Sequence, residues 1–148
     1  MFNDAIKMTG NLKLVLTDEH GNVKQEEEVK NLVVTVGKDF IASRMKDATA
    51  TAMTHMEVGT GTTAANVADT TLQSAVASSR VTLTSTTVTT NNVAYVATFP
   101  AGTGTGALTE AGLFNASSSG TMLCRTVFSV INKGAADTLG ITWTVTVN

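Results

Sequence analysis

The sequence has little charge, one cysteine, one proline and few aromatic residues, and these shortages exclude several classes of protein. Charged side chains make up 15% of the chain, against about 25% in an average soluble domain. The lone Cys124 excludes an intrachain disulfide bond, and its place in an apolar strand pattern predicts a buried, unreactive thiol. A formal net charge of −2 argues against nucleic acid or an anionic membrane as the main partner, because both attract clustered lysine and arginine.

Long apolar runs are also missing. No segment approaches the roughly 18 consecutive apolar residues of a membrane-spanning helix. The first residues lack the basic and apolar regions of a secretory signal, so we expect synthesis and assembly in a reducing cytoplasm. The length of 148 residues suits a single domain, in which residues 1–10 form either an ordered arm or a frayed end.

The charges that are present lie mostly in the first third of the chain. Residues 1–48 hold 15 of the 22 charged side chains, and residues 81–109 hold none. A freely soluble monomer normally mixes charges over its surface, whereas charged residues are depleted at the centres of protein interfaces. The uncharged stretch therefore predicts a surface that packs against neighbouring molecules.

Strict alternation of apolar and polar residues, typical of a half-buried strand, is clearest in residues 139–147. Similar patterns predict strands over residues 11–17, 23–29, 55–58, 79–90, 93–99, 108–114 and 121–128. The one helical pattern covers residues 38–46, where Phe40, Ile41 and Met45 are expected to cover one sheet face. The sequence predicts a mainly β fold, an antiparallel β-sandwich of about seven to nine strands with one short helix. The expected core residues are Phe40, Leu113, Leu123, Leu139, Ile141, Trp143 and Val145.

Three local signals refine this picture. Asn91 and Asn92 are expected to form a two-residue hairpin turn, because asparagine tolerates a left-handed backbone. Residues 69–72 have the pattern of a capped helical turn. The glycine-rich residues 59–61 follow a strand, but no lysine comes after them, so a phosphate-binding loop is excluded.

We find no pattern of residues that predicts catalysis, a metal site or a cofactor. His20 and His55 lie apart and belong to no zinc motif, and the acidic residues 26–28 alternate between strand faces, which favours a solvated edge over a cation site. Glu110 interrupts the uncharged stretch. We expect it to form a structural ion pair with Arg125 if residues 108–114 and 121–128 form a hairpin, and prefer this to a ligand-binding role.

Several segments of the chain, in this order, resemble small virion proteins of tailed bacteriophages and the particle-proximal domains of some phage tail-fibre proteins. The resemblance runs from about Met56 to the C-terminus. It rests on residues 58–63 (VGTGTT), 69–72 (DTTL), 108–115 (LTEAGLFN), 120–128 (GTMLCRTVF), 131–133 (INK) and 139–145 (LGITWTV). It implies a non-enzymatic structural role in the virion.

The leading hypothesis is a capsid decoration (cement) protein or head–tail accessory protein that self-associates and binds the phage particle. Its partners would be copies of itself and the major capsid protein or tail proteins, with no nucleic acid and no membrane. Candidate assembly contacts are Phe2, Ile6 and Met8, and the edge of the hairpin over residues 11–29 is another. A tail-fibre or tail-appendage protein is the first alternative. A carbohydrate-binding module is the second alternative. Trp143, however, lies at an apolar position of the alternating strand 139–147, which predicts a core residue and not an exposed ring that binds sugar.

Overall fold

The computed structural model describes residues 5–46 and 50–148 and contains nine strands and one helix in that part of the chain. In order, these are β1 (Met8–Thr17), β2 (Val23–Val33), α1 (Thr35–Lys46), β3 (His55–Gly59), β4 (Val81–Thr82), β5 (Ser85–Thr89), β6 (Asn92–Phe99), β7 (Gly106–Phe114), β8 (Met122–Lys133) and β9 (Thr138–Val147). All pairings between the named strands are antiparallel. The predicted mainly β, antiparallel architecture is therefore confirmed.

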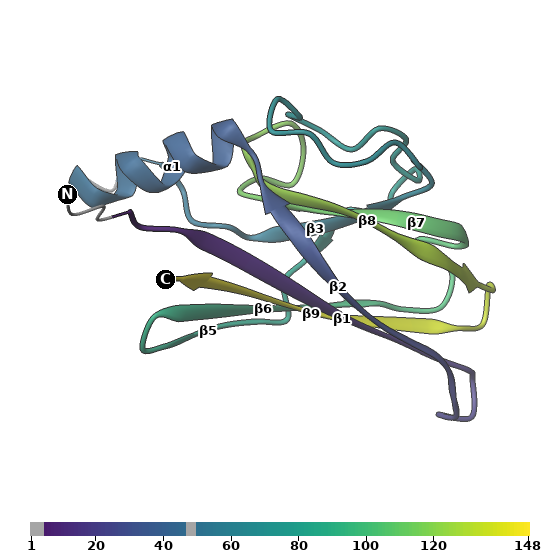
Figure 1. Ribbon diagram of the computed structural model, residues 1–148. Helices are drawn as coiled ribbons and strands as arrows, with labels where there is room; N and C mark the ends of the chain where they lie inside the picture. The colour runs from purple at the N-terminus through teal and green to yellow at the C-terminus, as the bar shows by residue number, and fades with distance from the viewer. Residues whose placement is uncertain (1–4, 47–49) are drawn as a thin grey trace.

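The nine strands form one continuous sheet in the order β4-β3-β7-β8-β2-β1-β9-β6-β5, which curls over into two layers (Figure 1). One layer contains β3, β7 and β8, and the other contains β1, β9, β6 and β5. β2 joins them at one corner. It pairs with β1 over most of its length but with β8 only at Leu32 and Val33.

The opposite corner lies between β4 and β5. The amide of Leu83 donates to the carbonyl of Thr54 at 2.9 Å, beside β3, and the next amide, from Thr84, donates to Val96 of β6 at 2.7 Å. Two successive residues thus bond to different layers. The single strand expected over residues 79–90 is wrong for this reason, because the chain changes layers in the middle of the β pattern.

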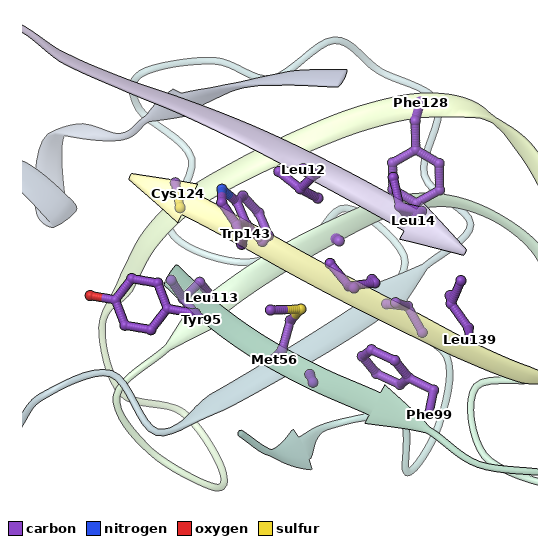
Figure 2. Close-up of a cluster of buried hydrophobic side chains, with 14 of the residues drawn as sticks. Leu12, Leu14, Met56, Tyr95, Phe99, Leu113, Cys124, Phe128, Leu139 and Trp143 are labelled. Atoms are coloured by element: carbon purple, nitrogen blue, oxygen red, sulfur yellow. The ribbon is translucent and has the colours of Figure 1, made fainter. Parts of the chain in front are cut away.

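The core fills the space between the layers, and the strand register builds it in rows. Leu12 of β1 lies opposite Trp143 of β9, which lies opposite Tyr95 of β6, and the next row joins Leu14 to Ile141 (Figure 2). Of the expected core residues, those with at most 4% exposure are Leu113, Leu123, Leu139, Ile141, Trp143 and Val145. Burial of each such aliphatic side chain stabilises the fold by about 2 kcal/mol. Phe40 is only half-buried and packs against the core from α1.

The helix ends at Lys46, as predicted, but it differs from its prediction in where it begins and in the exposure of its last turn. It begins at Thr35, three residues earlier than expected, because Gly37 permits close packing of its first turn against β8. A Cβ atom on Gly37 would overlap the carbonyl oxygen of Leu123. Met45, expected to cover the sheet, is 80% exposed. That expectation was wrong because the last turn of α1 runs beyond the layer it covers (Figure 1).

Two predicted turns also differ. The β5–β6 turn consists of Thr90 and Asn91, since Thr89 pairs with Asn92, and Thr90 takes the left-handed backbone (φ 49°). Residues 69–72 form no helical turn. The carboxylate of Asp69 instead accepts a hydrogen bond from the amide of Asn66 at 2.9 Å. Asp69 therefore stabilises the turn at residues 67–68, which comes before it, and does not begin a helical turn after it.

We expect Gly37→Ala to lower the free energy of unfolding by about 1–3 kcal/mol, because the new methyl group meets a backbone carbonyl that cannot move aside. The overlap outweighs the roughly 1 kcal/mol by which alanine favours a helix. Urea unfolding of both proteins measures the effect. Gly140→Ala is the matched control, since its nearest neighbour would be 3.9 Å away. Equal stability of the two variants would contradict the close approach of α1 to β8.

Candidate functional site

The ion pair predicted between Glu110 and Arg125 is present and lies at the centre of a buried polar network. Glu110 on β7 is 0% exposed and Arg125 on β8 is 2% exposed. The guanidinium Nη2 lies 2.8 Å from Oε2 of Glu110, and Nε donates to the same oxygen at 2.9 Å. β7 and β8 form the expected hairpin, with Gly112 opposite Arg125, so the two charged side chains lie diagonally on one face.

The Glu110 carboxylate also accepts hydrogen bonds from three backbone amides of the loop that joins β3 to β4. Gly61 donates to Oε1 at 3.0 Å, Ser74 to Oε1 at 2.7 Å and Gln73 to Oε2 at 3.0 Å. A Cβ atom on Gly61 would come 2.6 Å from this carboxylate, so glycine is needed there. Gly61 and residues 73–74 of the loop therefore bind an internal carboxylate with backbone donors, as a phosphate-binding loop binds its ligand.

Arg125 extends the network toward the surface. Its Nη1 donates to Asp69 at 2.9 Å and its Nη2 to the carbonyl of Thr63 at 3.0 Å. Glu110 and Arg125 together hold the loop at Gly61, Thr63 and Asp69, and again at Gln73 and Ser74. The loop covers the outer face of β7, where Leu72, Phe114 and Met122 form a second apolar cluster with Val34. β7 is thus buried on both faces.

The environment of Glu110 shifts its ionisation. Burial by itself raises the pKa of the carboxyl, because a charged group loses solvation. The hydrogen bonds from the amides of Ser74 and Gln73, followed by those from Arg125 and Gly61, outweigh burial and place the pKa of Glu110 below its ordinary value. The carboxylate is therefore held in its charged form.

A surface depression of about 420 Å³ lies over this network and is lined by residues 68–73 with Thr63 and Arg125. The polar side chains of Arg125 and Gln73, which line the depression, already form hydrogen bonds within the chain. The Arg125 guanidinium bonds Glu110, Asp69 and Thr63, and the Gln73 side chain bonds the Thr63 hydroxyl and amide. The arrangement acts as a clamp on the loop, which agrees with the structural role expected for the pair.

A second ion pair lies on the same outer face, over Phe114 at the end of β7. Arg80 bonds both carboxylate oxygens of Glu57 at 3.1 and 3.2 Å, and its guanidinium lies 3.7 Å from the ring centroid of Phe114. This geometry combines a bidentate ion pair with a cation–π contact. Sequence reasoning missed it, because nothing in the pattern indicates that Arg80 lies over a strand 34 residues later in the chain.

Other candidate groups stay apart. His20 lies in the exposed β1–β2 turn and His55 on β3, where its ring contacts the hydroxyl of Thr54. Within residues 5–46 and 50–148, no three His, Cys, Asp or Glu side chains gather closely enough to hold a metal ion. In the same ranges, no helix has the length and apolar character to cross a membrane. Cys124 is fully buried, as predicted, and burial raises the pKa of its thiol.

The predicted assembly contacts have different positions. Phe2 lies outside the described residues. Met8 is half-buried in β1, opposite Val147, so the expectation that residues 8–10 belong to a separate arm was wrong. Lys7 continues this pairing through two backbone hydrogen bonds with Asn148, of 2.7 and 3.2 Å. Ile6 is 75% exposed, as a contact residue requires.

Ile6 belongs to a larger apolar end of the molecule. Residues 5–7, the last turn of α1, the end of β9 and the end of β5 all lie at this end (Figure 1). They carry four exposed apolar side chains: Ile6, Met45 (80%), Val88 (71%) and Val147 (42%). The four side chains come from separate elements that share this end, and each is a candidate contact with a neighbouring molecule. We call these four residues the apolar end.

β5 borders the apolar end. All five of its residues are exposed and none is charged. Comparisons of the chain with protein-family models, with characterised proteins and with solved structures gave no match.

We expect Glu110→Gln to lower the free energy of unfolding by about 2–3 kcal/mol, because the amide replaces one of the two carboxylates that pair with the buried Arg125 and cannot accept all of the hydrogen bonds that Glu110 accepts. Chemical denaturation at neutral pH measures the loss. Glu28→Gln, at an exposed position on β2, is the matched control and should change stability by less than about 0.5 kcal/mol. If both variants were equally stable, the loop would not depend on the clamp.

The lowered pKa of Glu110 also predicts a pH dependence. A carboxyl whose folded pKa lies below its unfolded pKa stabilises the fold above the unfolded value, about 4.3, and loses this contribution as the pH falls through the folded pKa. The stability difference between the wild type and Glu110→Gln should therefore be largest near neutral pH and shrink below about pH 4. Comparing the two proteins removes the contributions of Asp18 and Asp137, whose pKa values are also lowered. A difference that stays constant with pH would contradict the assignment.

Proposed function

We propose that this protein is a non-enzymatic structural protein of a tailed bacteriophage virion, namely a capsid decoration (cement) or head–tail accessory protein. It associates with copies of itself and binds the major capsid protein or tail proteins after assembly in the host cytoplasm. The observation that carries the proposal is the exposed, uncharged strand β5, together with the four exposed apolar side chains of the apolar end. The resemblance to phage virion proteins supports it.

The distribution of exposed groups favours a protein that is covered by neighbours. Residues 81–109 carry no charge, and the five residues of β5 within them face solvent in the isolated chain. The apolar end adds three further large apolar side chains, of which Met45 and Ile6 are the most exposed. Depletion of charge beside exposed apolar groups is typical of the centre of a protein interface.

The buried network favours a structural role for the same chain. The strongest cluster of ionisable groups, Glu110 with Arg125 and Asp69, is occupied by internal hydrogen bonds that fix the β3–β4 loop. A protein that holds a particle together needs a fixed shape that is repeated in many copies. Many weak contacts on one particle then add up through avidity.

The alternatives differ in location and in ligand. A tail-fibre or tail-appendage protein would use the same kind of contact at fewer positions. A carbohydrate-binding module would need an exposed aromatic platform. Trp143 is 0% exposed and Tyr95 is 9% exposed, so neither ring offers one.

We expect the purified protein to co-sediment with particles of the phage that encodes it and to appear in images of the intact virion. On the order of hundreds of copies per particle would indicate the capsid shell, and about six to eighteen copies would indicate the tail. A protein that never enters the particle fraction, at any concentration, would overturn the proposal.

The apolar end gives a more specific test. The double variant Ile6→Glu with Met45→Glu should weaken binding to particles at least about tenfold, because it places two charges in the proposed contact. Val130→Glu is the matched control, since Val130 is 45% exposed near the end of β8, which lies at the other end of the molecule (Figure 1). Unchanged binding by the double variant would remove the apolar end from the contact.

A further inference from the structure

The free edges of the sheet are protected to different degrees. β4 ends the sheet on one side and has only two residues, Val81 and Thr82. The part of β2 that does not pair with β8 carries exposed charges, among them Lys24, Glu26 and Glu28. Short length and charged side chains are the usual means by which proteins prevent edge strands from pairing with other chains.

Side chains also fill the open side of β2. The side-chain Nε2 of Gln25 donates to the carbonyl of Val130 on β8 at 2.9 Å, and the hydroxyl of Thr126 on β8 donates to the carbonyl of Lys30 on β2 at 2.8 Å. These bonds connect β2 to β8 where the two strands no longer pair. Together with the charges, they make this edge of the described sheet a poor place for an incoming strand.

β5 ends the sheet on the other side and has none of these devices. Its sequence, Ser-Thr-Thr-Val-Thr, contains no charge and no proline. Its pairing with β6 runs from Ser85 opposite Val96 to Thr89 opposite Asn92 without a bulge. β-branched residues at four of the five positions favour the extended conformation. β5 is thus a regular strand with one side unpaired.

The register identifies the unpaired backbone groups. The two-residue turn at Thr90 and Asn91 makes Thr89 and Asn92 a hydrogen-bonded pair, as in two-residue hairpins. Bonding alternates along an antiparallel strand, so Ser85, Thr87 and Thr89 direct their amides and carbonyls toward β6. Thr86 and Val88 direct theirs outward. These two residues offer two donors and two acceptors to a neighbouring strand.

We propose that β5 pairs with β5 of a second copy of the chain, antiparallel, about a two-fold axis at Thr87. In this register Thr86 lies opposite Val88 of the other copy, and the two residues exchange both backbone hydrogen bonds, which gives four bonds in all. The pairing deepens the proposed function, because it names the surface and the geometry of the self-association on which that function rests.

The side chains of β5 suit a second copy. The strand meets an identical strand across the axis, so a charge at Thr87 would face the same charge and a charge elsewhere would lie close to its copy, and β5 carries none. The two Thr87 residues would be direct neighbours on the outer face, as a non-hydrogen-bonded pair with Cα atoms about 4.5 Å apart. Val88 would pack beside Thr86 of the other copy, which reduces its 71% exposure. The two-fold symmetry closes the contact and gives a dimer, not a filament.

Charge placed at the axis tests the proposal. We expect the wild type to sediment at twice the 15.3 kDa monomer mass, and Thr87→Lys and Thr87→Glu to dimerise at least about tenfold more weakly because like charges meet. Mixing the two variants at low salt should restore a heterodimer. Thr98→Lys is the matched control, since it adds the same charge at an exposed position of β6 and should leave the dimer intact. A wild type that remains monomeric, or a Thr87→Lys variant that dimerises as well as the wild type, would overturn the proposal.

Cysteine cross-linking tests the register. Thr87→Cys should form a disulfide-linked dimer under mild oxidation, because a cross-strand distance of about 4.5 Å suits a disulfide. Thr89→Cys alone should not, whereas a mixture of Thr89→Cys with Ser85→Cys should cross-link, since these positions face each other. The buried Cys124 does not interfere. Cross-linking of Thr89→Cys with itself would indicate another register and overturn the axis at Thr87.

Particle binding separates this inference from the proposed function. A wild type that co-sediments with virions but never dimerises would overturn the β5 pairing and leave the virion role intact. A wild type that dimerises through β5 but never enters the particle fraction would overturn the virion role and leave the β5 pairing intact.

Discussion

The buried carboxylate of Glu110 is the constraint on which one whole face of the molecule depends. The β3–β4 loop pairs with the sheet at a single isolated bridge, between Gly59 and Ala75. Its backbone is otherwise anchored mainly by bonds to Glu110 and Arg125, with further bonds from Thr109 to Gly61 and from Thr35 to Val67. With the loop in place, Phe114 and Met122, on the outer face of the hairpin, are shielded from water. The ion pair thus contributes to the burial of the second face of β7.

This face contrasts with the edge formed by β5. Around Arg125 and Glu110, buried donors and acceptors meet partners within the chain, at distances of 2.7 to 3.0 Å. At β5 a regular strand ends the sheet with neither charge nor bulge. The chain satisfies its polar groups internally on one side and leaves backbone groups unpaired on the other. That asymmetry suits a protein whose fold is complete only within a larger assembly.

The sequence predicted what short-range patterns encode. The alternation around Trp143 identified a strand and its buried face, and the isolation of Glu110 in a neutral stretch pointed to Arg125 across one hairpin. It could not predict features set by distant segments. The split of residues 79–90 depends on which layer each amide reaches. The early start of α1 depends on the contact of Gly37 with Leu123, and the cover over Phe114 depends on a loop held by charges far along the chain.

The position of β1 in the sheet has a consequence for how the chain reaches this structure. β1 lies between β2, which follows it directly, and β9, whose Thr138 pairs with Thr17 across 121 residues. During synthesis the first hairpin must wait, with one edge open, until residues 138–147 have emerged. Closing so distant a contact is slow, because the entropy of the intervening chain is lost before the pairing is gained. The charged side chains of β2 favour solubility of the hairpin during this interval, because charge opposes strand-to-strand aggregation.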